Sequence, residues 1–85
     1  MQPVTIYTKP GCPYCVRALR LLGEKGADVT EIQAAYDKDK KAEMVQRSGG
    51  RTTFPQVFVG QTHVGGSDDL AALDRRGKLD ALLAG

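Results

Sequence analysis

The sequence is poor in the residues that would indicate several common kinds of site. It contains no tryptophan, one histidine, and two cysteines separated by two residues. A structural zinc site needs four ligands, so Cys12, Cys15 and the distant His63 are too few to build one. Small secreted domains usually carry several disulfides, and a bridge between such close cysteines would stabilise a fold little. We therefore expect the two cysteines to act chemically.

Long apolar runs and basic stripes are also missing. No segment approaches the roughly 20 apolar residues needed to cross a bilayer, and the first residues lack the basic and apolar regions of a signal peptide. The net charge is only +2, and the basic residues are scattered. This distribution argues against a nucleic-acid partner. We expect one globular domain over residues 1–85, in the cytoplasm, with no membrane partner.

Hydrophobic periodicity predicts an α/β fold. Alternation and β-branched residues predict strands at residues 4–8, 29–33, 56–59 and 62–64, with a type II′ turn at Gly60-Gln61. Helical spacing predicts helices at residues 13–25, 37–47 and 67–75, and a last short helix containing Leu79, Leu82 and Leu83. The first helix is expected to bury Val16, Leu19 and Leu22. The order βαβαββα plus a terminal helix predicts a four-stranded mixed sheet flanked by helices, with its first two strands parallel.

Both cysteines lie in the run Tyr7-Thr8-Lys9-Pro10-Gly11-Cys12-Pro13-Tyr14-Cys15, between the first strand and the first helix. Pro13 suits the first helical position, so Cys12 falls on the N-cap. There its sulfur faces unpaired backbone N–H groups and the positive end of the helix, which favour a thiolate, as does nearby Lys9. We expect Cys12 to be exposed and acidic, and Cys15 to be shielded and closer to a free thiol. This asymmetry predicts a nucleophile, Cys12, and a resolving cysteine, Cys15.

Two further motifs accompany the cysteines. Thr53-Phe54-Pro55 precedes the third strand, and Gly65-Gly66-Ser67-Asp68-Asp69 opens the third helix. Together with Cys12-Pro13-Tyr14-Cys15, and in this order, they resemble the motifs of small bacterial glutaredoxins of the dithiol class. The resemblance covers nearly the whole chain, although the family often has valine where Phe54 stands. It implies a thioredoxin-like fold and glutathione-dependent thiol-disulfide exchange, with no tightly bound cofactor.

The resemblance also implies site residues and partners. The catalytic pair would be Cys12 and Cys15, and Pro55 would follow a cis peptide bond. The residues expected to bind glutathione are Lys9, Tyr14, Thr53, Phe54, Pro55, Gly66, Ser67 and Asp68. Arg47 and Arg51 are additional candidate cations. The expected partners are glutathione, as co-substrate, and glutathionylated or disulfide-containing proteins such as ribonucleotide reductase, with the chain acting as a monomer.

Two alternative functions stay open. The first is a redoxin that is reduced by thioredoxin reductase; the lack of tryptophan and the anchors Lys9 and Asp68 argue against it. The second is a dimer that holds a [2Fe–2S] cluster through Cys12 and glutathione. Pro13 argues against this second function, because it rigidifies the turn, and cluster-holding relatives usually carry a small residue there. His63 is expected to be a surface or hairpin residue without a catalytic role.

Overall fold

The computed structural model describes residues 1–85, and its elements follow the predicted order. They are β1 (Pro3–Thr8), α1 (Pro13–Glu24), β2 (Asp28–Gln33), α2 (Lys38–Arg47), β3 (Gln56–Val59), β4 (Thr62–Gly65), α3 (Ser67–Arg75) and α4 (Leu79–Ala84). No helix combines the length and the apolar character that a transmembrane span requires. The periodicity and turn residues of the sequence thus located every helix and strand of the structure.

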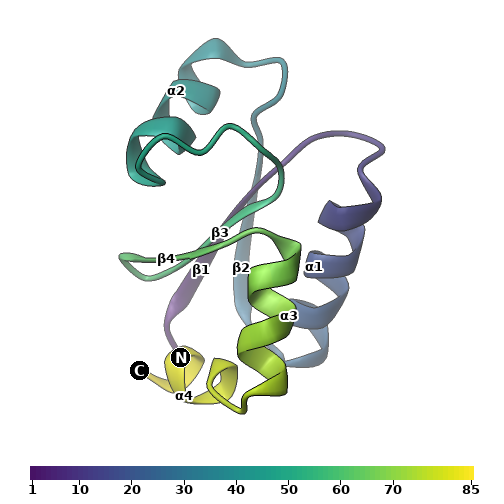
Figure 1. Cartoon of the computed structure of the whole chain (residues 1–85), viewed down its shortest axis with the longest axis vertical. Helices are drawn as coiled ribbons and strands as arrows, with labels where there is room; N and C mark the ends of the chain where they lie inside the picture. Colours follow the sequence, from purple (N-terminus) through teal and green to yellow (C-terminus); the bar gives the residue numbers. More distant parts are fainter.

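The four strands form one mixed sheet in the order β2-β1-β3-β4 (Figure 1). β1 is parallel to β2, as the predicted βαβ unit requires, and antiparallel to β3. β3 and β4 form an antiparallel hairpin whose turn is Gly60-Gln61. Gly60 has φ 57°, as the predicted turn requires of its first central residue. The mixed sheet and the flanking helices confirm the predicted fold class.

The register of β1 and β3 brings two loops together. Tyr7, near the end of β1, lies opposite Gln56, the first residue of β3. The loop that follows β1 and carries Cys12 therefore emerges at the same end of the strands as the loop that precedes β3 and carries Pro55. Sheet pairing alone thus accounts for the approach of two motifs that are about forty residues apart in sequence.

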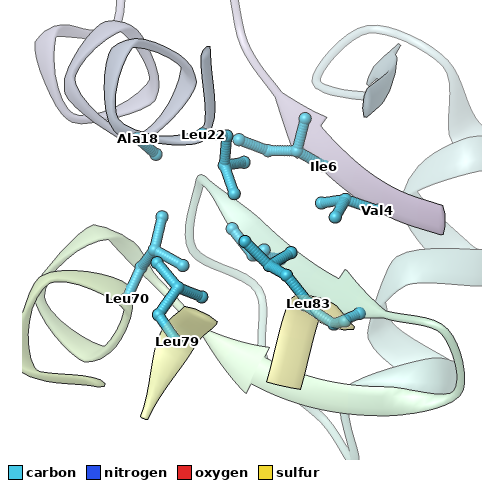
Figure 2. Packing of buried hydrophobic residues seen from close by; sticks show 9 residues of the cluster. Val4, Ile6, Ala18, Leu22, Leu70, Leu79 and Leu83 are labelled. Atoms are coloured by element: carbon cyan, nitrogen blue, oxygen red, sulfur yellow. The ribbon is translucent and has the colours of Figure 1, made fainter. Parts of the chain in front are cut away.

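Helices α1, α3 and α4 cover one face of the sheet, and α1 and α3 lie side by side (Figure 1). Nine buried residues form the core on this face: Val4, Ile6, Ala18, Leu22, Val57, Val59, Leu70, Leu79 and Leu83. Figure 2 shows Leu22 of α1 beside Ile6 of β1, with Leu70 and Leu79 contributed by the two later helices. This packing fixes α1, and with it the position at which the helix begins.

The opposite face of the sheet packs against α2 through a smaller cluster of Tyr7, Ala34, Met44 and Phe58. Polar contacts supplement this small core. The Tyr7 hydroxyl donates to the Glu43 carboxylate and accepts a hydrogen bond from Arg47 Nη1 at 2.9 Å. The Arg47 guanidinium also lies over the Phe58 ring, 4.3 Å from its centroid. Arg47, a candidate glutathione contact in the sequence, is thus engaged in packing α2 against the sheet.

The predicted burial of Val16 is wrong. Val16 is 53% exposed, whereas Cys15, Ala18 and Leu22 are the buried residues of α1. Their spacing of three and four residues places them on one helical face. Cys15 and Ala18 are small residues, and they are a weaker hydrophobic signal in the sequence than valine.

This correction gives a matched pair of stability predictions. Leu22→Ala should lower the free energy of unfolding by about 2–5 kcal/mol, because it leaves a cavity in the core on the α1 face. Val16→Ala on the same helix should change it by no more than about 0.5 kcal/mol. Urea denaturation followed by circular dichroism measures both values. Equal losses in the two variants would show that the buried face of α1 is assigned wrongly.

Candidate active site

The Cys12 sulfur is the cap of the first helix. Cys12 has an extended backbone (φ −93°, ψ 112°), and Pro13 takes the first helical position. Gly11, with φ 70°, turns the chain into this cap. The Cys15 N–H donates to Cys12 Sγ at 3.4 Å. The sulfur is therefore held where free backbone N–H groups and the helix dipole stabilise a negative charge.

This environment lowers the pKa of Cys12 from its ordinary value. Burial is the largest single influence, and by itself it would raise the pKa. Hydrogen bonds from the Cys15 side chain and from the Cys15 and Tyr14 N–H groups act in the opposite direction. The positive charge of Lys9 adds to them, and together these effects outweigh burial. Cys12 is thus the thiol that ionises more readily.

Cys15 behaves differently, because burial raises its pKa to about 11, and the neighbouring Cys12 sulfur also disfavours its ionisation. The pKa values of the two thiols therefore differ in the predicted direction. The predicted exposure of Cys12 is wrong, however, since both cysteines are only 3% exposed. The capping hydrogen bond explains this burial, because it folds the Cys12 sulfur back over the first turn of α1.

A cavity of about 290 Å³ lies beside the cysteine motif. Its lining residues come from the start of α1, the loop before β3 and the start of α3: Tyr14, Arg51, Thr53, Phe54, Pro55, Gly66, Ser67, Asp68 and Asp69. The peptide bond between Phe54 and Pro55 is cis, as the family resemblance implied. The cavity thus brings together seven of the eight residues that were expected to bind glutathione.

Lys9 is the eighth of these residues, and it does not line the cavity. It is exposed in the loop after β1. The structure assigns it an electrostatic effect, because its charge favours the Cys12 thiolate.

Asp69 is a cavity residue that the sequence reasoning did not single out. Its carboxylate accepts a hydrogen bond from the Gly66 N–H at 3.0 Å and pairs with Arg51 Nη2 at 3.7 Å. A Cβ on Gly65, which has φ 118°, would collide with this carboxylate. The three-residue spacing from Gly66 to Asp69, typical of a capping box, was the available signal. Arg51, the second candidate cation, does line the cavity.

No group of three or more His, Cys, Asp and Glu side chains is close enough to hold a metal ion. His63 lies in β4 of the hairpin, as expected, but it is partly buried. Its Nε2 is 2.7 Å from Gln56 Oε1. The arrangement can therefore perform chemistry at sulfur, with an acidic thiol, a less acidic thiol beside it, and a polar cavity at the same end of the strands.

Comparison with known proteins gives a consistent result. The glutaredoxin family model matches residues 4–64. A glutaredoxin of Pseudomonas aeruginosa is 54% identical, over 99% of this chain and 99% of its own length. The solution structure of a glutaredoxin from Brucella melitensis is 59% identical and superposes with a TM-score of 0.83, covering 98% of this chain and 89% of the other. The crystal structure of a buckwheat glutaredoxin-glutathione complex is 32% identical, with a TM-score of 0.85 over 98% of this chain and 77% of that chain.

The hydrogen bonds around the sulfur predict how Cys12 titrates. Its alkylation by iodoacetamide should have an apparent pKa below the value of about 8.5 of a free cysteine, so the rate falls as the pH drops through that lower pKa. Cys15→Ala removes a donor to the thiolate and should raise the Cys12 pKa. Cys15→Ser keeps a hydroxyl donor and should raise it less. A Cys12 pKa that is the same in Cys15→Ala as in the wild type would contradict this account.

Proposed function

The chain belongs to the glutaredoxin family and is a glutathione-dependent disulfide oxidoreductase, and we propose that it reduces glutathione mixed disulfides and protein disulfides through Cys12 and Cys15. One observation carries the proposal: an acidic sulfur on a helix N-terminus lies at the same end of the strands as a polar cavity. Tyr14, which lies between the two cysteines, lines that cavity. Such a thiolate is the species that attacks disulfides.

In the first proposed reaction, the Cys12 thiolate attacks the glutathionyl sulfur of a mixed disulfide. The bond between that sulfur and the substrate breaks, and the substrate leaves as a thiolate that takes up a proton. A second glutathione, as its thiolate, then attacks the glutathionyl sulfur on Cys12. This releases glutathione disulfide and restores the Cys12 thiolate. Glutathione supplies both electrons as co-substrate, and sulfur exchange needs no further group.

In the second proposed reaction, Cys12 attacks a protein disulfide and forms a mixed disulfide with the protein. Cys15, as its thiolate, then attacks the Cys12 sulfur, which releases the reduced protein as a thiolate and leaves a disulfide between Cys12 and Cys15 that two molecules of glutathione reduce. The high pKa of Cys15 depends in part on the neighbouring Cys12 sulfur. Because Cys12 carries no charge in the mixed disulfide, Cys15 ionises more readily at the step in which it is needed.

The cavity offers groups that complement glutathione. The N-terminus of α3 suits the carboxylate of the γ-glutamyl end, and Asp68 suits its ammonium group. The Phe54 N–H and C=O take part in no backbone hydrogen bond, so they are free to pair with the cysteine part of the tripeptide. We assign the glycine carboxylate to Lys9, with Arg51 as a second cation on the cavity wall.

We further propose that the chain works as a monomer in the cytoplasm. All the residues assigned to the site come from one chain. A site that works through free thiols also suits a reducing compartment. Its protein substrates would be glutathionylated or disulfide-containing proteins, with ribonucleotide reductase as a candidate.

The reductant and the roles of the cysteines are tested with two substrates, one glutathionylated and one a protein disulfide. The wild type should turn over with glutathione as the only reductant, and should fail with thioredoxin reductase in place of glutathione. Cys12→Ser should abolish turnover of both substrate classes, because the nucleophile is lost. Cys15→Ser should keep deglutathionylation and lose protein-disulfide reduction. Loss of deglutathionylation in Cys15→Ser would refute the assigned roles.

The assigned charges are tested by their effect on KM. Asp68→Asn and Lys9→Met should each raise the KM for the glutathionylated substrate about fivefold, because each removes one charged partner of the tripeptide. Asp28→Asn makes the same charge change as Asp68→Asn at an exposed position at the start of β2, and serves as its matched control. A KM in Asp68→Asn no higher than in this control would remove Asp68 from the site.

A further inference from the structure

Gln56 is a fully buried polar side chain that the proposed chemistry does not use. It is the first residue of β3 and has 0% exposure. Its Nε2 donates to the Thr53 carbonyl at 3.0 Å and to Thr53 Oγ1 at 3.1 Å. Its Oε1 lies 2.7 Å from His63 Nε2. All of its hydrogen-bonding groups are engaged, and Thr53, which holds two of them, lines the cavity.

The hydrogen bonds fix the orientation of this amide and the tautomer of the histidine. The Thr53 carbonyl can only accept, so Gln56 must turn its NH₂ group toward it. The Gln56 carbonyl oxygen then faces His63, and the contact is a hydrogen bond only if His63 carries a proton on Nε2. Burial and the nearby Arg51 charge lower the His63 pKa, against the effect of Asp69, so the ring is neutral near pH 7. Neutral His63 is therefore the Nε2–H tautomer.

Packing holds the His63 ring in place to make this contact. The ring lies on Phe58, with centroids 4.9 Å apart and planes inclined by 34°. Phe58 is itself buried, meets the Tyr7 ring edge-on and lies beneath the Arg47 guanidinium. The donor that faces Gln56 is thus carried by a ring packed in an aromatic cluster on the α2 face of the sheet.

The Gln56 amide determines where the next backbone donor points. The Thr53–Phe54 peptide bond is trans, so its C=O and N–H point in opposite directions. Because Gln56 draws the Thr53 carbonyl inward, the Phe54 N–H is directed away from Gln56. That N–H makes no backbone hydrogen bond, and Phe54 lines the cavity. A rotated Gln56 amide would place two carbonyl oxygens together and release this peptide plane.

We propose that Gln56 and His63 are positioning residues of the tripeptide site, which hold the Thr53–Phe54 peptide so that its N–H faces the bound ligand. The proposal rests on the proposed function, because the ligand is the glutathionyl group of the substrate. Neither residue touches the reacting sulfurs. Their effect should therefore fall on KM, and the acidity of Cys12 should stay unchanged.

The tautomer is measured on the unmodified protein. His63 is the only histidine, so a long-range ¹H–¹⁵N correlation spectrum contains one imidazole. Recorded at a pH where the ring is neutral, it should show the proton on Nε2. A proton on Nδ1 would overturn the proposal, because His63 could then not donate to the Gln56 carbonyl.

Variants measure the effect on binding. Gln56→Met keeps the length of the side chain and removes its hydrogen bonds, and should raise the KM for a glutathionylated substrate about tenfold. His63→Phe keeps the ring on Phe58 and removes the donor, and should raise it about fivefold. In His63→Gln the side-chain amide nitrogen lies the same number of bonds from Cβ as the histidine Nε2, so it can donate to Gln56 in its place. The KM should therefore stay within about twofold of the wild type. In all three, kcat should change by less than about threefold and the Cys12 pKa should not shift.

Leu83→Ala, which removes a buried side chain of α4 from the core on the opposite face, is the control for general destabilisation and should leave KM unchanged. A wild-type KM in both Gln56→Met and His63→Phe, or the same rise in His63→Gln as in His63→Phe, would overturn the positioning role. If Gln56→Met does not fold, the two His63 variants decide. If the wild type itself does not use glutathione, the proposed function fails and this role falls with it. If the wild type turns over with glutathione and the variants keep the wild-type KM, only the positioning role is refuted.

Discussion

The hydrogen bond from the Cys15 N–H to the Cys12 sulfur is the contact on which the site depends. It keeps the sulfur on the N-terminus of α1, where the helix compensates a negative charge that burial would otherwise disfavour. The helix begins there because Pro13 takes its first position, and it stays there because Ala18 and Leu22 pack against the sheet. The acidity of the nucleophile therefore follows from the core as much as from the motif.

The same sheet explains why a cavity lies next to this sulfur. The pairing of Tyr7 with Gln56 brings the loop that carries Cys12 beside the loop that carries Pro55, and the β3–β4 hairpin returns the chain to the start of α3. Gln56 belongs to both the sheet and the cavity wall, since its backbone is part of β3 and its side chain holds Thr53, which lines the cavity. Strand register and a single buried amide thus connect the fold to the shape of the site.

Much of this arrangement could be predicted from the sequence, because its signals are local. Alternation, helical spacing, Pro13 and Gly60 located the elements, and three short motifs indicated most of the cavity wall. The predictions that were wrong concern features that depend on tertiary contacts. The burial of Cys12 follows from the direction of its capped side chain, and the exposure of Val16 from the face of α1 that meets the sheet. The packing of Arg47 against Tyr7 and Phe58 likewise has no local signal, because both partners are distant in sequence.

The central claim is that the capped sulfur of Cys12 itself takes up the glutathionyl group. The most direct measurement mixes the Cys15→Ser protein with a glutathionylated substrate, quenches the reaction at short times and locates the modification by peptide mass spectrometry. The account predicts a glutathionyl group on the peptide that contains Cys12, which disappears when glutathione is added. Continued deglutathionylation of the substrate with no such group ever forming on Cys12 would contradict it.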